Sequence, residues 1–259
     1  MQKVAKALFA VVLALGLSHE GAFGQVAAFE PQNPRIGDEV IVTYNPGAKG
    51  AAILKPKELT LQTLILPEFG ILPIVLETSM VQSGTIWKGS FTLNQGDARF
   101  LLYQFISGDL KDDNAEQGWS GRVLATNGDN LEGTRYWNGI ALAFGGYQGF
   151  KFRKDVGAAK SEIAQERKLF PNNYSAVNIA WYLEVNPTPS ESALARITNE
   201  LEIELKRFRN VQDALPMILV WMEQTGGKAR ADSLRQVLIA ENPRGKVASV
   251  TRMREISQE

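Results

Sequence analysis

Residues 34–44 read PRIGDEVIVTY, and this stretch decides the fold of the first half of the chain. Its Gly-Asp dipeptide is typical of a turn, and Val40, Val42 and Tyr44 then occupy every second position. Side chains two residues apart lie on the same face of an extended strand, whereas a helix would scatter them. The stretch therefore predicts a turn followed by a half-buried β-strand.

The same alternation recurs outward from this stretch. Trp87 and Phe91 keep the period of two, and residues 100–106 are almost wholly apolar, which is typical of a central strand covered on both faces. Turn residues separate the apolar runs at Asn33-Pro34, Asn45-Pro46-Gly47, Ser83-Gly84 and Gly96-Asp97. About seven short strands separated by turns predict a β-sandwich over residues 25–126.

Beyond residue 126 the composition changes. Residues 127–154 combine turn residues with aromatic side chains and glycines, and we interpret them as a segment that connects two halves. From residue 155 the apolar period becomes helical, and prolines and paired glycines end successive runs. Residues 155–259 therefore predict about six helices, arranged as about three antiparallel hairpins.

Each hairpin occupies about 35 residues, close to the period of the tetratricopeptide repeat. The second half is therefore predicted to be an all-α, tetratricopeptide-like array, with an irregular helical bundle as the alternative. Together with the sandwich, this makes the chain an α+β multidomain protein. The third helix is expected to begin at Thr188, with Pro189 in its first turn and the Glu191 carboxylate completing a capping box.

Residues 1–24 have the pattern of a secretory signal peptide. Lys3 and Lys6 precede an apolar run over residues 7–17, and Ala22-Phe23-Gly24 supplies small residues for cleavage. The alternative, a membrane anchor, needs about 20 apolar residues, roughly twice the length of this run. We expect cleavage to leave an exported protein without a membrane span, in the periplasm or the extracellular space.

Residues 25–259 contain neither cysteine nor histidine, because the chain has no cysteine and its one histidine is His19. This composition excludes Cys-His and Ser-His-Asp catalysis, zinc sites of the Cys/His type, histidine-ligated haem and dithiol chemistry. The 28 basic and 28 acidic residues balance, which argues against nucleic acid as a partner. We therefore expect a protein that is not an enzyme and holds no cofactor.

Several short motifs follow one another in the middle of the chain: Gly108-Asp109, Asp112-Asp113-Asn114, Gly118-Trp119, Gly133-Thr134 and Tyr136-Trp137. Their order resembles the N-terminal region of exported thioredoxin-like proteins of the Bacteroidetes and Chlorobi type. In that family a β-sandwich precedes tetratricopeptide-like helices and then a thioredoxin domain with a Cys-x-x-Cys site. Residues 29–40 also resemble the first two strands of bacterial Ig-like domains, so the sandwich is expected to be Ig-like.

The chain ends at Glu259 without a thioredoxin domain, so the redox activity of that family is not expected here. What the resemblance implies is the role of the accessory region. We therefore expect a scaffold that docks a protein partner in the cell envelope of a Gram-negative-type bacterium, as an accessory to a thiol-redox or assembly system.

An acidic hairpin supplies the candidate metal ligands Asp109, Asp112, Asp113 and Asn114. Carboxylate and amide oxygens are the ligands that Ca²⁺ prefers, but the spacing is not that of an EF-hand. Asp and Asn also stabilise turns, which is the alternative interpretation. The sequence does not decide between them, and no metal is assigned.

Aromatic residues supply the candidate ligand-facing side chains Tyr136, Trp137 and Tyr147. Flat rings bind sugars, so a carbohydrate-binding sandwich is the first alternative function; the rings can equally be packing residues. A glycoside hydrolase, which needs only two carboxylates, is the second alternative. A docking protein predicts a concave, partly apolar face on the helices, a sugar binder predicts coplanar exposed rings, and an enzyme predicts a pocket with converging carboxylates.

Overall fold

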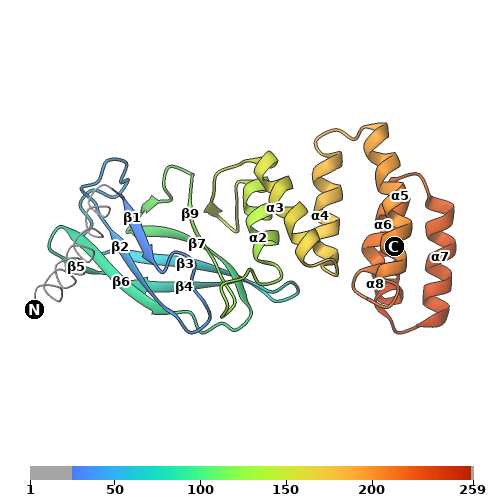
Figure 1. The fold of residues 1–259 in the computed structure, drawn as a ribbon, viewed down its shortest axis with the longest axis horizontal. Coiled ribbons are helices and arrows are strands. Elements are labelled where there is room, and N and C mark those ends of the chain that lie inside the picture. The colour runs from blue at the N-terminus through green and yellow to red at the C-terminus, as the bar shows by residue number, and fades with distance from the viewer. Residues whose placement is uncertain (1–24, 258–259) are drawn as a thin grey trace, which may run out of the picture. The chain divides into compact units, whose positions relative to one another are not determined.

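The computed structural model describes residues 25–257, so the predicted signal peptide, residues 1–24, lies outside the described residues. The chain divides into two compact units, and the division falls between Asp155 and Val156. The first unit carries antiparallel sheets and the second consists of helices (Figure 1). The predicted α+β class is therefore confirmed. In the described part of the chain, no helix is long and apolar enough to cross a membrane.

Two antiparallel sheets build the first unit. One has the order β1-β2-β6-β5, with β1 (Ala27–Glu30), β2 (Glu39–Tyr44), β6 (Ile86–Thr92) and β5 (Val81–Ser83). The other has the order β4-β3-β7-β8, with β4 (Ile74–Ser79), β3 (Thr60–Pro67), β7 (Ala98–Ser107) and β8 (Leu110–Asp112). Strand β9 (Trp119–Arg122) also pairs with β7 (Figure 1).

The inner faces of the two sheets share one hydrophobic core. Val40, Val42 and Tyr44 of β2 are fully buried in it, as their period of two predicts. Trp87 and Phe91 of β6 lie in the same core, so this alternation is confirmed as well. The core therefore positions β2 and β6 by burying every second side chain.

Strand β7 is the central strand that its sequence predicts, and its two ends have different partners on one edge. Residues 105–107 pair with β8, and residues 100–103 pair with β9. Between β8 and β9 the loop leaves the sheet, and Asn114, Ala115 and Glu116 all have positive φ angles. The loop returns at Gly118, where a Cβ atom would lie 2.3 Å from the backbone oxygen of Lys151, so only glycine fits.

The interpretation of residues 127–154 as a connecting segment is wrong. They contain α2 (Thr134–Phe144) and a short hairpin of β10 (Gly146–Tyr147) and β11 (Phe150–Lys151), all within the first unit. Helix α2 packs against β7, and the Trp137 indole donates a hydrogen bond of 2.5 Å to the backbone oxygen of Pro67. Burial of one helix face on the sheet outweighs the low helix propensity of its glycine and aromatic residues.

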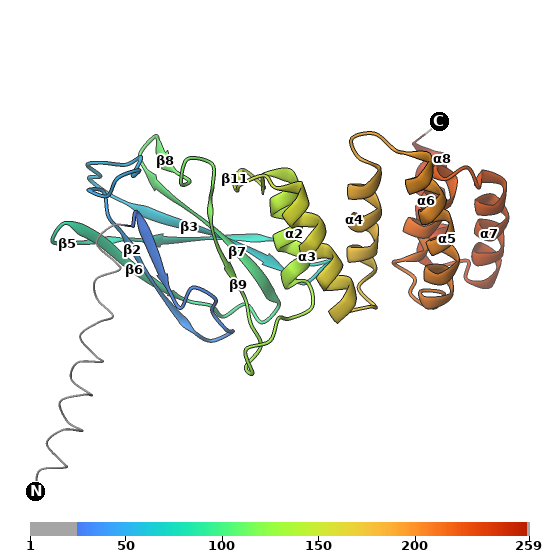
Figure 2. The same ribbon diagram turned by 45° about the horizontal axis from the view of Figure 1, so that its top comes forward.

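The second unit contains six helices within the described residues, at the places where the apolar periods predict them. They are α3 (Val156–Leu169), α4 (Tyr174–Val185), α5 (Glu191–Arg207), α6 (Leu215–Gln224), α7 (Lys228–Glu241) and α8 (Lys246–Ile256). Each helix packs against the next along the chain, and α6 also packs against α8 (Figure 2). Trp181 and Trp221 meet edge to face in the core of this unit, with ring centroids 5.6 Å apart, so both are packing residues.

The predicted start of helix α5 is wrong by two residues. Ser190, and not Thr188, is the N-cap residue, and its hydroxyl accepts a hydrogen bond of 3.1 Å from the Ala193 amide. Ser190 has the extended backbone that an N-cap requires. Glu191 is then the first helical residue, too early to complete a capping box.

Two variants, Ser190→Ala and Thr188→Ala, test which residue is the N-cap of α5. Ser190→Ala removes the acceptor for the Ala193 amide and should lower the stability of the helical unit by about 1 kcal/mol. Thr188→Ala, two residues earlier, should change it by much less. Hydrogen exchange at the first turn of α5 measures both variants, and a larger effect from Thr188→Ala would contradict the assignment.

Two buried tyrosines should make the first unit sensitive to alkali. Burial raises the pKa of Tyr44 and of Tyr103 well above the usual value of 10.0. The contribution of these two tyrosines to the free energy of unfolding is complete below about pH 10. Above this pH only the tyrosines of the unfolded chain ionise, so each buried tyrosine lowers the free energy of unfolding by about 1.4 kcal/mol per pH unit. Hydrogen exchange of residues 25–155 at pH values above 10 should show this slope, and Tyr103→Phe should roughly halve it. An unchanged slope in Tyr103→Phe would contradict the explanation.

Candidate functional site

The candidate aromatic residues gather around helix α2. Trp137 is buried, and the rings of Tyr136 and Tyr147 lie 5.2 and 5.3 Å from it, with their planes turned by 71° and 70°. Edge-to-face contacts of this kind are typical of packing. The three rings therefore do not form the coplanar exposed surface that a sugar binder predicts. Trp87 is buried in the core and Trp119 packs edge to face on Phe105.

The candidate ligand Asp112 is a buried structural residue. One carboxylate oxygen accepts hydrogen bonds from the Tyr44 hydroxyl at 2.7 Å and from the Ala52 amide at 2.8 Å. The other oxygen accepts a bond of 2.9 Å from the Asn114 amide. Because Tyr44 and Asp112 come from different sheets, this carboxylate joins the sheets and anchors the loop that follows β8.

The remaining members of the acidic hairpin mostly make the hydrogen bonds of a turn. Asp113 accepts a bond of 2.9 Å from the Glu116 amide, and the Asn114 side chain donates one of 3.2 Å to the oxygen of Gly118. Asp109 lies at the turn between β7 and β8, outside this network. In residues 25–257, no three acidic or histidine side chains converge to hold a metal ion. This geometry does not supply the set of ligands that the calcium hypothesis requires.

A groove of about 340 Å³ opens on the helical unit between α3, α4 and α5. Its apolar lining consists of Ile163, Ala164, Ala180 and Leu183. Its charged lining consists of Lys160, Arg167, Glu184, Arg196 and Glu200. The groove thus combines a partly apolar surface with charged side chains from all three helices.

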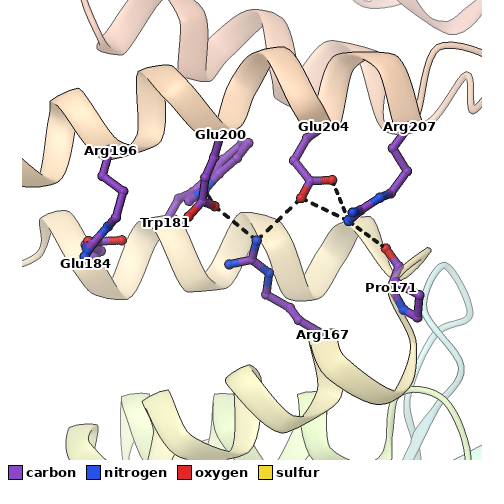
Figure 3. A network of polar contacts seen from close by, with 8 residues as sticks. All are labelled: Arg167, Pro171, Trp181, Glu184, Arg196, Glu200, Glu204 and Arg207. Atoms are coloured by element: carbon purple, nitrogen blue, oxygen red, sulfur yellow. Dashed lines mark hydrogen bonds and ion pairs between the residues drawn. The ribbon is translucent and has the colours of Figure 1, made fainter.

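Arg167 crosses from α3 to α5 in the wall of this groove (Figure 3). Its guanidinium donates to Glu200 at 3.1 Å and to Glu204 at 3.5 Å. The Trp181 indole of α4 donates to the same oxygen of Glu200 at 2.9 Å. Glu200 is therefore held by donors from two neighbouring helices, which fixes the positions of all three helices around the groove.

Glu204 is the buried charge of this network. Burial raises its pKa, while Arg207 and Arg167 oppose the rise. Arg207 contacts the carboxylate at 2.9 Å and also donates to the backbone oxygen of Pro171 at 3.3 Å (Figure 3). The network therefore joins α5 to the loop between α3 and α4.

Two other charged residues of the groove differ in their pairing. Arg196 of α5 forms an ion pair with Glu184 of α4 (Figure 3). Lys160 of α3 is exposed, and the described residues contain no ion-pair partner for it. The unpaired charge of the groove is therefore positive.

Arg side chains pair with both carboxylates of the groove lining, Glu184 and Glu200. The helical apolar period of residues 155–259 predicts the helices but does not identify a groove between them. The signal in the sequence is Arg167, a charged residue within an otherwise apolar helical stripe. A charge at such a position indicates a side chain that is buried or that bridges to another element.

Compared with protein-family models, curated proteins and solved structures, the chain has no match.

The Arg167 network predicts a pH-dependent loss of stability. Arg167→Met removes a cation that lowers the pKa of Glu204, so the pKa in the folded state should rise further. A raised carboxyl pKa penalises the fold at high pH, and the penalty disappears as the pH falls below the ordinary value of 4.5. The variant should therefore lose roughly 1–3 kcal/mol at pH 7 and much less at pH 4.

Urea unfolding followed by hydrogen exchange of residues 156–257 measures this loss. Arg244→Met, which alters an exposed arginine of the same unit, is the control and should have little effect at either pH. An equal loss for Arg167→Met at both pH values would show that Arg167 acts by packing and not by charge.

Proposed function

We propose that this protein is an exported, non-catalytic scaffold that binds a segment of an envelope protein in the groove between α3, α4 and α5. The observation that carries the proposal is the partly apolar groove whose helices are held in place by the Arg167–Glu200–Trp181 contacts. A rigid wall lowers the conformational cost of binding, because its side chains are ordered before the partner arrives.

The charges of the groove indicate the chemistry of the partner. Arg167 and Arg196 are paired with carboxylates of the groove itself, whereas Lys160 is not. A segment that places an acidic side chain near Lys160 and small apolar side chains against Ala164 and Ala180 would complement this lining. We therefore propose an acidic, partly apolar segment as the occupant.

We also propose an Ig-like assignment for the first unit. Its sheet orders, β1-β2-β6-β5 and β4-β3-β7-β8, correspond to the strand orders A-B-E-D and C′-C-F-G of Ig-like sandwiches. For the second unit we propose a tetratricopeptide-like array, which the antiparallel helical hairpins and their mainly nearest-neighbour contacts support. Both assignments agree with an accessory region of the thioredoxin-like type, whose role would be docking.

A photo-cross-linking amino acid at position 164 tests the proposed function in cells that express the full chain. Ala164 is exposed and lines the groove, and Ala229, exposed on α7, is the control position. We expect a discrete cross-linked protein from position 164 and none from position 229. Equal cross-linking at both positions, or none at position 164, would contradict the proposal.

Charge reversal separates specific docking from chance contact. Lys160→Glu should lower the cross-linking yield about tenfold, a loss of about 1.4 kcal/mol. Lys168→Glu alters an exposed lysine of the same helix outside the groove and should leave the yield unchanged. Fractionation of the same cells tests export, since the cross-linked product should lie in the envelope fraction.

A further inference from the structure

A second cleft, of about 630 Å³, lies in the first unit between the edge strand of one sheet and the edge strand of the other. Strand β1 and its flanks line one side, and the start of β9 with Asn114 and Gly118 lines the other. Phe29 and Trp119 bring aromatic rings to it, with centroids 6.5 Å apart. Glu30 is the one charged residue among its lining side chains.

The backbone of β1 presents unpaired groups on its outer edge. The Asn45 amide donates to the oxygen of Val26 at 2.8 Å, in the same register as the β1–β2 ladder. Hydrogen-bonded pairs alternate along an antiparallel ladder, so residues 26, 28 and 30 face β2 and the N–H and C=O groups of Ala27 and Phe29 face away from it. No hydrogen bond within residues 25–257 reaches those groups.

The same reasoning applies to β9. The Val123 amide donates to the oxygen of Arg99 at 3.0 Å, which places Trp119 and Gly121 toward β7 and Ser120 away from it. The outward Arg122 amide already has a partner, the side-chain oxygen of Asn33 at 2.9 Å. The backbone groups of Ser120 have none within the described residues.

Both edges run in the same direction. The chain that follows β1 meets the chain that follows β9 in a parallel bridge between Arg35 and Leu124, where the Leu124 amide donates to the oxygen of Pro34 at 3.0 Å. A strand lying between β1 and β9 can therefore be antiparallel to both. Antiparallel pairing gives straight hydrogen bonds to each edge.

We propose that this cleft is a peptide-binding site that takes an extended segment of a partner protein by β-strand addition. The segment pairs with the outward backbone groups of Ala27, Phe29 and Ser120, as peptides do at exposed sheet edges. Alternate apolar side chains contact Phe29 and Trp119. Glu30 is the last residue of β1, and the N-terminal end of a segment antiparallel to β1 lies beside it. The segment therefore carries a lysine or arginine near its own N-terminal end, where this side chain can pair with Glu30.

A displayed library of ten-residue peptides, panned on protein purified after expression of the full chain, tests the site. We expect selected peptides to alternate apolar and polar residues and to carry a basic residue in their N-terminal half. On binding, the amides of Ala27, Phe29 and Ser120 should exchange at least tenfold more slowly. Selection of no peptide, or of peptides that leave these amides unchanged, would overturn the proposal.

Protection that is already present without peptide would also overturn it. If the protection of these amides from exchange rises with protein concentration, a second copy of the chain pairs with the strand edges. If they are protected at all concentrations, another segment of the same chain pairs with them. Both results mean that the cleft is not open to a partner.

Two variants locate the interaction. Ser120→Pro removes an outward amide but no bond to β7, which edge strands tolerate, and should weaken the selected peptide about tenfold, or about 1.4 kcal/mol. Glu30→Lys should weaken it similarly, and a peptide with glutamate in place of its basic residue should recover the affinity. Glu39→Lys, on β2 of the same sheet and outside the cleft, should bind normally. Failure of the charge swap would overturn the assigned orientation and with it the proposal.

Discussion

Apolar burial without a disulfide is the constraint on which both units depend, because the chain has no cysteine. Each unit therefore has to close a hydrophobic core from side chains alone. Any charged group inside that core needs a partner, since an unpaired buried charge costs several kcal/mol. Two buried carboxylates show how this requirement is met. Asp112 is satisfied by neutral donors in the first unit, and Glu204 is compensated mainly by arginines in the second.

The Asp112 carboxylate links the core of the first unit to its edge. Its bonds to Tyr44 and Ala52 hold the end of β8 against the opposite sheet, and its bond to the Asn114 amide starts the loop that leaves the sheet. That loop divides the edge of β7 between β8 and β9. The cleft beside β9 thus depends on the hydrogen bonds of the Asp112 carboxylate. The acidic hairpin that suggested a calcium site supplies this carboxylate and the loop that follows it.

The Glu204 carboxylate has a different role, because its partners are long, charged and shared between helices. Arg167 and Arg207 reach it from α3 and α5, and Trp181 holds the neighbouring Glu200 from α4. A network of this kind ties three helices together at the surface of their core, where a purely apolar contact would allow them to slide. The groove is the space that this bridged arrangement leaves between the helices.

The sequence by itself determined the elements whose period is repeated over many residues. The alternation of Val40, Val42 and Tyr44 predicted strand β2, and the helical apolar period from residue 155 predicted the helices of the second unit, because each repeated period fits only one type of secondary structure. Tertiary structure alone decided helix α2, whose glycines and aromatic rings become helical only when β7 and Pro67 cover one face. It alone also decided the burial of Asp112, the groove of the second unit and the cleft of the first. These depend on contacts between residues far apart in the chain, and no local pattern encodes which polar group will meet which partner.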